Sequence, residues 1–470
     1  MKEVRLAGNV TGEQLDALLC PAAPGARVII CGVCRFSGCY TFSSKHTVIF
    51  GTDACLFLEE QAVLCFDCVI EAGNTRLFDG PGTVEIHSMA QGNPFWFGAK
   101  GDGVTDDTAA FVRTWQVFNQ ITLPYTENGY VLDRIELLPD RVLQGQPDQH
   151  PTVKAAPGCT RLFHVTRGQC AVHHIRFDMA AAAEPSTAFF FDTSVKKEGS
   201  IGVSHFTITH CEFYDAYHVF TDAQNTALML FMHFEDILCK DGRHSTFDIE
   251  DFEGFIFLKR FTIDNADSMR KHHLTKAFPA VDIDDVRGTI FEEMTVIGSN
   301  SGQPEEIGFL LPGSVALMAS LWWDRVTIKD MGGYGIVFGL ADTPDSDENR
   351  ISTVLCSLIH TDILHCGGGV LVDRSWDLQM DDVRIDTQGY HVPGTAGIRL
   401  SRSRNSHLLN VVCRGHGGDG IALDRCEHIT TAGCTLCGNS GFGYSDSGGT
   451  GNLMTRCLLE HNEAGSVHKA

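Results

Sequence analysis

The chain has 470 residues, of which 36 are basic and 59 acidic, so its formal net charge is −23 at pH 7. A charge of this sign opposes binding to nucleic acid or to an anionic membrane surface. No segment approaches the ~18 consecutive apolar residues of a membrane-spanning helix, and residues 1–20 lack the apolar stretch of a secretory signal. We therefore expect synthesis in the cytosol, no nucleic-acid partner and no membrane insertion.

The first 92 residues contain several strand patterns, such as Arg27–Ile30 and His46–Phe50. They predict a strand-rich N-terminal region at 1–92, either a small separate domain or the first coils of the region that follows. Cys31-x-x-Cys34 and Cys65-x-x-Cys68 have the inner spacing of a zinc ribbon. Other cysteines recur within strand-like patterns, where Cys serves as a small core hydrophobe. We therefore expect free thiols, no metal and no cofactor.

A glycine-rich turn and a helical pattern follow, with the sequence GAKGDGVTDDTAAF at 98–111. Thr105 or Asp106 is expected to be the N-cap of a helix at about 106–118, with Asp107 in its first turn, where the helix dipole favours a carboxylate. The helix would cover the open end of a stack of strands.

This helix pattern and its continuation resemble the opening of the pectate-lyase-like right-handed parallel β-helix, as found in polysaccharide-cleaving phage tailspikes. The continuation consists of Ile121–Pro124, Gly129–Leu132 and Leu138–Gly145. The resemblance implies an all-β, single-stranded solenoid over 93–470 with an N-terminal capping α-helix. It indicates the fold rather than the reaction, because the motif carries no catalytic group.

The C-terminal half repeats one short pattern, a glycine followed by a strand, every 23 to 34 residues. The repeats are Gly335–Phe338, Gly369–Val372, Gly397–Leu400, Gly420–Leu423 and Gly443–Ser445. A second short strand precedes each of them. Short strands with alternating faces at this period are typical of the coils of a parallel β-helix.

Acidic residues interrupt this pattern on two neighbouring coils, at 247–251 and 281–285. Asp248 and Asp282 occupy outward positions where other coils have Phe220, Leu310, Val337 and Leu371. Two carboxylates ~4.8 Å apart repel by roughly 3 to 4 kcal/mol at an effective dielectric constant of ~20. One of them should therefore keep its proton, bind a cation or pair with an arginine. A protonated and an ionised carboxyl side by side are what a glycosidase needs.

The two acidic coils also look like the site of O-antigen-cleaving tailspike hydrolases, in which a Glu on one coil faces an Asp-x-x-Asp on the next. Glu250, Asp282 and Asp285 match that arrangement. The chain has more acids than the arrangement requires, so the choice among Asp248, Glu250 and Asp251 stays open. The alternative interpretation is a solvated acidic face or a cation site.

A second group of candidate residues lies on another strand ladder. Counting by alternation, Trp322 should face the core, and the outward set is Glu293, Trp323, Arg325, Asp362, Asp382 and Arg384. Trp323 could stack on a sugar ring, with Arg325, Asp362 and Asp382 binding the substrate. Alternatively the charges form surface ion pairs that contribute little each. A third group, the basic run Arg270–His273 near Asp264 and Asp267, is expected in a loop beside the acidic coils.

The sequence thus favours a carbohydrate-active enzyme that hydrolyses a bacterial surface polysaccharide, as a tailspike-like depolymerase. A polysaccharide lyase and a non-catalytic glycan-binding or structural tail protein are the alternatives. Neutral glycans suit the net charge better than acidic ones, unless the groove is locally basic. We further expect a homotrimer, located in a virion tail or released from the cell.

Overall fold

The computed structural model describes residues 3–19, 26–192, 203–223, 229–312, 318–339, 353–390 and 392–470, apart from the side chains of 250–253 and 285. The chain divides into two compact units. Unit 1 comprises residues 1–135, 139–159 and 170–177, and unit 2 comprises residues 136–138, 160–169 and 178–470. Two strands, β14 (Ile135–Leu137) and β19 (Arg176–Asp178), fall where the units divide.

Unit 1 begins with helix α1 (Gly12–Leu19) and two parallel sheets. The first sheet contains β1 (Glu3–Thr11), β2 (Arg27–Ser37), β4 (Thr47–Phe50), β5 (Cys55–Leu58), β7 (Val69–Glu71) and β8 (Phe78–Asp79). The second contains β3 (Cys39–Phe42), β6 (Val63–Phe66) and β9 (Thr83–Ile86). The boundary at residue 92 between an N-terminal domain and the β-helix remains a prediction.

The glycine-rich turn leads into helix α2 (Thr108–Val117), close to the predicted range. Its N-cap is Asp107 and not Thr105 or Asp106. The Asp107 carboxylate does not bond to the helix; it accepts hydrogen bonds from the backbone N–H groups of Lys100 (2.6 Å) and Gly101 (3.1 Å). These two bonds hold the carboxylate against the preceding glycine-rich turn. It therefore makes no capping hydrogen bond to the first N–H groups of the helix.

The buried face of α2 carries Phe111 and Trp115, which lie one helical turn apart. The helix packs on β10 (Gln91–Gly92) and β12 (Gln120–Leu123), and also on β9. The other elements of unit 1 are the 3-10 helix η1 (Pro94–Phe97), β11 (Asp102–Asp106), β13 (Gly129–Leu132), β15 (Val142–Gly145), β16 (Thr152–Ala155) and β18 (Cys170–His173).

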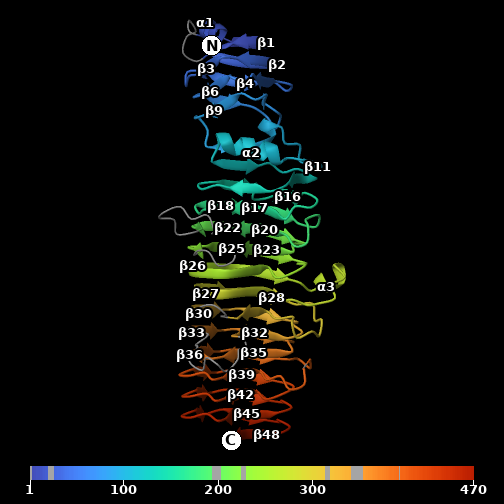
Figure 1. The fold of residues 1–470 in the computed structure, drawn as a ribbon, viewed down its shortest axis with the longest axis vertical. Coiled ribbons are helices and arrows are strands. Elements are labelled where there is room, and N and C mark those ends of the chain that lie inside the picture. The colour runs from blue at the N-terminus through green and yellow to red at the C-terminus, as the bar shows by residue number, and fades with distance from the viewer. Residues whose placement is uncertain are drawn as a thin grey trace. The chain divides into compact units, whose positions relative to one another are not determined.

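Unit 2 is a parallel β-helix whose coils each contribute strands to three rows (Figure 1). Row 1 contains β17 (Arg161–Val165), β20 (Thr187–Phe191), β23 (His218–Asp222), the first part of β26 (Phe247–Asp264), the first part of β27 (Val281–Glu292), β29 (Phe309–Leu311), β32 (Tyr334–Phe338), β35 (Gly368–Asp373), β39 (Ile398–Ser401), β42 (Ile421–Asp424), β45 (Phe442–Ser447) and β48 (Gly465–Lys469). The predicted repeat is confirmed, because all five glycine-led strands lie in this row.

Rows 2 and 3 complete each coil, and long strands such as β26 pass from one row to the next. Row 2 contains β22 (Phe206–Tyr214), β25 (His233–Lys240), β30 (Met318–Asp324), β33 (Thr353–Ile359), β37 (Gln379–Asp381), β40 (His407–Leu409), β43 (Thr430–Ala432) and β46 (Leu453–Thr455). Row 3 contains β28 (Thr295–Ile297), β31 (Thr327–Lys329), β34 (Asp362–Leu364), β38 (Arg384–Asp386), β41 (Val412–Arg414), β44 (Thr435–Cys437) and β47 (Leu458–Glu460). The short strands β21 (Val203–Ser204), β24 (Met229–Leu230) and β36 (Ser375–Trp376) and helix α3 (Ser268–Lys271) lie outside these rows.

The interior of unit 2 is built from side chains that stack on their equivalents in the next coil. Phe163 stacks on Phe189 with ring centroids 5.0 Å apart, and Phe220 stacks on Phe247 at 4.8 Å. Burying one such ring stabilises the fold by about 2 to 3 kcal/mol. Cysteines fill the same interior as small hydrophobes, and burial raises the pKa of the Cys356 thiol to about 12.

Each coil turns from row 2 to row 3 at one residue with a left-handed backbone. These corner residues include Asp236, Arg260, Glu293, Arg325, His360 and Asp382, with φ between 47° and 55°. A left-handed residue breaks the alternation of inward and outward side chains, because the strand does not continue straight through it. The corner therefore resets which residues face the core.

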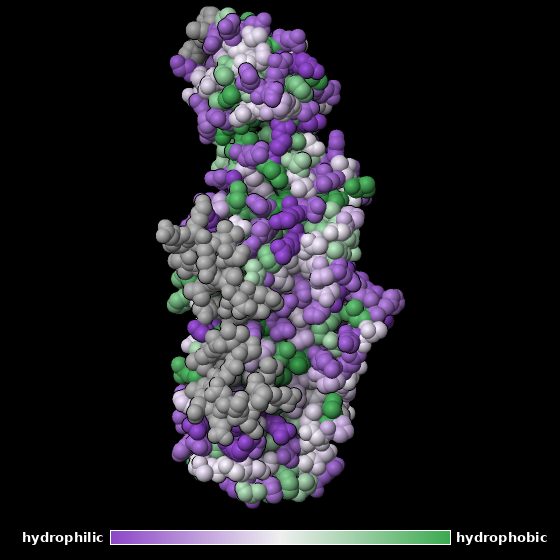
Figure 2. All heavy atoms as spheres, viewed as in Figure 1, coloured by the Kyte–Doolittle hydropathy of each residue, from purple (hydrophilic) through white to green (hydrophobic). Residues whose placement is uncertain are grey.

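Exposed hydrophobic side chains are scattered among polar ones on the face shown in Figure 2. In the part of the chain that the structure describes, no helix is long and apolar enough to cross a membrane.

Candidate active site

The two acidic segments lie side by side in row 1 of unit 2, as predicted. β26 and β27 pair in parallel with Asp248 opposite Asp282, and Leu310 is the next residue along that row. On the other side Asp248 pairs with Thr221, and not with Phe220, which belongs to the core. Asp248 is exposed and Asp282 is half-buried. Two carboxyl groups on neighbouring strands thus form an outward pair.

The environment of Asp282 favours the protonated acid. Burial, followed by the negative charges of Asp248 and Asp284, raises the pKa of Asp282 to about 7. Such a carboxyl is available as a proton donor at neutral pH, whereas an ordinary carboxyl is not. The repulsion expected from the sequence is therefore present, and it acts on Asp282.

His218 is an additional member of the site that the sequence did not suggest. Its Nδ1 lies 2.8 Å from the carbonyl oxygen of Ser245, so the Nδ1–H group donates a hydrogen bond to that oxygen. In the neutral ring this places the lone pair on Nε2, which lies 3.4 Å from Oδ2 of Asp248. Burial lowers the pKa of His218, although Asp248 opposes this shift. A neutral imidazole with a free lone pair beside a carboxylate can accept a proton.

An aromatic stack lies behind His218. The ring of His244 is sandwiched between Tyr217 at 5.0 Å and Phe278 at 5.3 Å, with both rings tilted by 15°. Burial and the neighbouring His218 lower the pKa of His244 to about 4. The stack joins three successive coils and gives His218, 4.7 Å from His244, a rigid support. Isolated His and Tyr residues in loops gave no sequence signal for it.

Two sequence-predicted catalytic residues fall on the same strands, but their side chains lie outside the described residues. Glu250 lies on β26, and Asp285 lies on β27 opposite Asp251. The backbone register therefore places Glu250 one position away from the Asp251–Asp285 pair and two from the Asp248–Asp282 pair. Their roles remain predictions from the sequence.

The second predicted group is not arranged as expected, and the assignment of Trp323 to the surface is wrong. Trp323 is fully buried and stacks on Phe291 with ring centroids 4.7 Å apart, whereas Trp322 is 47% exposed. Alternation fails here because Arg325 is a left-handed corner residue with φ of 54°, so the face of a residue before the corner does not follow from the faces after it. Trp323 therefore cannot stack on a sugar in this structure.

Among the described residues, most charged members of that group, though not Asp362, form surface ion pairs. Arg325 lies 2.6 Å from both Glu292 and Asp324, and 3.4 Å from Glu293. Asp382 is 72% exposed and lies 3.9 Å from Nε2 of His360. Asp362 pairs with Thr327 and Arg384 on the neighbouring strands of row 3. Substrate binding by Arg325, Asp362 and Asp382 remains a prediction.

The basic run forms α3 and the turn after it, and its charges are largely neutralised. Arg270 lies 2.6 Å from Asp267, and Lys271 lies 2.5 Å from Asp215 and 3.0 Å from Asp241. These contacts tie the loop to row 3 rather than leaving positive charge for a ligand.

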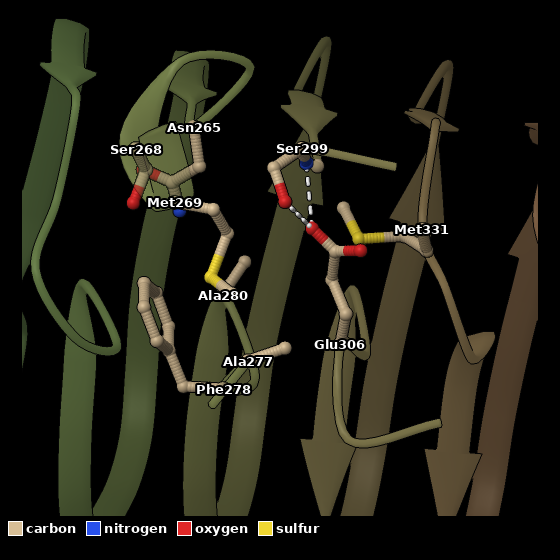
Figure 3. A pocket seen from close by; sticks show the side chains of 10 residues that line it. Asn265, Ser268, Met269, Ala277, Phe278, Ala280, Ser299, Glu306 and Met331 are labelled. Atoms are coloured by element: carbon tan, nitrogen blue, oxygen red, sulfur yellow. Dashed lines mark hydrogen bonds between the residues drawn. The ribbon is translucent and has the colours of Figure 1, made fainter. Parts of the chain in front are cut away.

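A small interior cavity lies near the aromatic stack, with Phe278 in its lining (Figure 3). Its volume is about 10 Å³, room for one water molecule. The buried carboxylate of Glu306, at one side, accepts hydrogen bonds from the backbone N–H and the hydroxyl of both Ser299 and Ser301, and from the N–H of Gly332. Glu306 thus fixes a turn, and the cavity is too small to hold a sugar.

Among the residues that the structure describes, no group of three or more His, Cys, Asp or Glu side chains could hold a metal ion. Cys34 and Cys68, from the two Cys-x-x-Cys pairs, are buried, and burial raises the pKa of Cys68 to about 11. These thiols behave as core side chains.

Comparison with known proteins supports the fold directly. A family model described as "Right handed beta helix region" matches residues 322–469. Two solved structures, the A-modules of the mannuronan C-5 epimerases AlgE4 and AlgE6 of Azotobacter vinelandii, superpose with TM-scores of 0.52 and 0.50 at 13% and 14% identity. The matches cover 80% of this chain and 99% and 97% of those modules.

A tailspike protein of bacteriophage CBA120 also matches, with a TM-score of 0.45 and 12% identity, over 80% of this chain and 59% of that one. No curated protein matches the chain in sequence. The chain is a right-handed parallel β-helix, as the sequence motifs implied. At these identities the solved structures define the fold alone.

Proposed function

We propose that this protein is a carbohydrate-active enzyme that hydrolyses glycosidic bonds in a bacterial surface polysaccharide. The observation that supports this most directly is the Asp248–Asp282 pair, in which Asp282 has a pKa of about 7 beside an exposed carboxyl. The mannuronan epimerases supply only an analogy, since they are β-helices named for a sugar polymer.

In the proposed reaction, Asp282 donates its proton to the glycosidic oxygen as the bond to the anomeric carbon breaks. The Asp248 carboxylate attacks that carbon or removes a proton from the attacking water. The lone pair on Nε2 of His218, 3.4 Å from Oδ2 of Asp248, can take up the proton released by water. If Asp248 has attacked the carbon, water deprotonated by the Asp282 carboxylate then cleaves the resulting ester, which returns a proton to Asp282 and frees the Asp248 carboxylate. If Asp248 has instead deprotonated the attacking water, it loses that proton to solvent as the products leave, and Asp282 regains one from solvent.

A lyase is the second candidate, and the neutral Nε2 of His218 favours it. A lyase removes a proton next to a sugar carboxyl group and expels the leaving glycosidic oxygen, which leaves an unsaturated product. His218 would serve as the base and Asp282 as the acid. Absorbance of the unsaturated product in the ultraviolet distinguishes this reaction from hydrolysis.

The biological setting that we propose is a tailspike-like depolymerase, in a virion tail or released from the cell. We also propose a homotrimer with a strand-rich domain at 1–92. Light scattering tests the trimer, and a monomer that persists across micromolar concentrations would exclude it.

The proposed activity is tested by reducing-end release from capsular and O-antigen extracts. Asp282→Asn and Asp248→Asn should each lower turnover by ~10² or more while the protein stays folded, since acid–base groups supply rate factors of this size. Glu250→Gln should do the same if the sequence-predicted carboxylate takes part. Asp377→Asn removes an exposed acid that belongs to none of the predicted sites, and it should change turnover less than about twofold.

The outcomes separate the candidate functions. Release of reducing ends that depends on Asp282 supports the hydrolase, and an ultraviolet-absorbing product supports the lyase. If the folded protein binds these glycans and releases neither product, it is a non-catalytic glycan-binding protein and the proposal is wrong.

A further inference from the structure

The outward row that carries Asp248 and Asp282 continues over earlier coils of unit 2. Thr221 lies opposite Asp248, Phe190 opposite Thr221, and His164 opposite Phe190. A glycan lying across the coils at Asp248 and Asp282 would therefore pass over Thr221 and Phe190. The side chains at these positions determine which sugars fit.

An arginine covers this part of the row. The guanidinium carbon of Arg161 lies 3.6 Å from the ring centroid of Phe190, and the ring of His164 lies 5.6 Å from it on the preceding strand. Phe190 is only 7% exposed although its position faces outward. A flat guanidinium stacked on a phenyl ring is held in one orientation and keeps its N–H donors free at the edge.

Arg161 and His218 occupy equivalent positions two coils apart. Arg161 pairs with Thr187, and Thr187 pairs with His218. Arg161 reaches Phe190, three residues beyond its partner on the next coil, and His218 reaches Asp248 in the same diagonal way. The guanidinium and the imidazole therefore lie on the same face, over the same row.

Within the described part of the chain, no acidic side chain neutralises the charge of Arg161. Among the described residues Arg161 makes no hydrogen bond and no ion pair, in contrast to Arg260 and Arg325. Asp192, which follows the strand of Phe190, has its Oδ2 2.9 Å from Nε2 of His164. A half-buried guanidinium without a counter-ion is a site for an anion, because charge-assisted hydrogen bonds to it are strong.

We propose that Arg161, held on Phe190, binds an acidic substituent of the glycan whose cleaved bond lies at Asp248 and Asp282. This inference rests on the proposed function and names its substrate class, an anionic polysaccharide. Phe190 is two strand spacings from Asp248, about 10 Å, so the acidic sugar is near the cleaved bond rather than at it. The local positive charge also offsets the long-range repulsion that a net charge of −23 imposes on such a substrate.

The test compares binding and turnover across an array of bacterial capsular and O-antigen polysaccharides, both acidic and neutral. The acidic glycans should be retained, and Arg161→Ala should weaken that retention by about 10- to 100-fold, the usual range for a hydrogen bond to a charged group. In turnover the loss should appear in KM, with kcat changed little. Carboxyl-reduced and desulfated forms of each retained glycan show whether a carboxylate or a sulfate is bound.

Two variants serve as controls for charge and shape. Arg161→Lys keeps the charge but not the fork or the flat stacking, so it should recover only part of the affinity. Arg414→Ala removes an exposed arginine from row 3 and should leave retention unchanged. With the acidic substituent of the glycan neutralised, the unchanged protein should bind as weakly as Arg161→Ala binds the acidic glycan. On the neutralised glycan, Arg161→Ala and the unchanged protein should bind equally.

The inference and the proposed function fail in different ways. Retention that depends on Arg161 without product release overturns the hydrolase and leaves the anion site standing. If the protein releases product, and Arg161→Ala binds the same glycans as tightly as the unchanged protein does, the anion site alone is overturned. Binding to neutral glycans only, or to no glycan, also overturns it.

Discussion

Two charged regions of unit 2 lie on the same stacked coils but differ in chemistry. At Asp248 and Asp282, like charges face each other on straight strands, and burial holds the pKa of Asp282 near 7. At the corner around Arg325, the arginine forms ion pairs with Glu292 and Asp324 on the solvent-exposed surface, so the opposite charges compensate each other. The comparison shows that stacking alone creates no site; a site arises where the stacked charges remain unsatisfied.

The largest difference between the regions concerns the two tryptophans beside the corner. Trp323→Ala should lower the free energy of unfolding by about 3 to 5 kcal/mol, because a fully buried ring stacked on Phe291 leaves a cavity. Trp322→Ala should change it by less than about 1 kcal/mol, since that ring is half-exposed. Urea unfolding of both variants measures the difference, and equal effects would contradict the assigned core.

The difference between straight strands and corners also explains which parts of the fold and of the candidate site the sequence predicts. The glycine-led repeats predict the coils correctly, and the acids of β26 and β27 predict a stacked pair, because alternation holds along a straight strand. Alternation fails at Arg325 and Glu293, whose left-handed backbones no local sequence rule specifies. Alternation therefore predicts Trp323 on the outer surface, whereas its side chain lies in the core.

The rest of the candidate site depends on contacts between coils that are distant in sequence. His218 meets Asp248 thirty positions later, and His244 is placed between Tyr217 and Phe278 by the stacking of three coils. The coils differ in length, so a single sequence does not fix which loop residues meet. The same holds for Arg161 on Phe190.

The next effect is a pH-dependent stability change at Asp282. In the unfolded chain this carboxyl titrates near 4, and in the folded protein near 7. Between these values the folded state binds more protons than the unfolded state, so the free energy of unfolding falls as pH rises through this range. Above about pH 7 the destabilisation caused by Asp282 has reached its full size. Asp282→Asn removes the penalty and should stabilise the protein at pH 8 by on the order of 3 kcal/mol.

The measurement for Asp282 is urea unfolding of the unchanged protein and of Asp282→Asn at several pH values. Asp382→Asn is the matched control at the exposed corner. The gain from Asp282→Asn should disappear below about pH 4, where the carboxyl of the unchanged protein is protonated in both the folded and the unfolded state. A gain that is independent of pH would show that Asp282 is destabilising for reasons other than its charge. In activity, kcat/KM of the hydrolase should fall as pH rises above about 7, because the acid is then lost.

The smallest effect belongs to Arg325. Its contacts with Glu292, Glu293 and Asp324 are close, but the guanidinium is 48% exposed, and water and salt screen these ion pairs. Arg325→Ala should therefore cost at most about 1 kcal/mol in low salt and less in high salt, and turnover should change only if Arg325 also binds the substrate. Urea unfolding at two ionic strengths checks the first part, and reducing-end release checks the second. A large loss of turnover with normal stability would move the substrate-binding surface to this corner and reverse the contrast between the two regions.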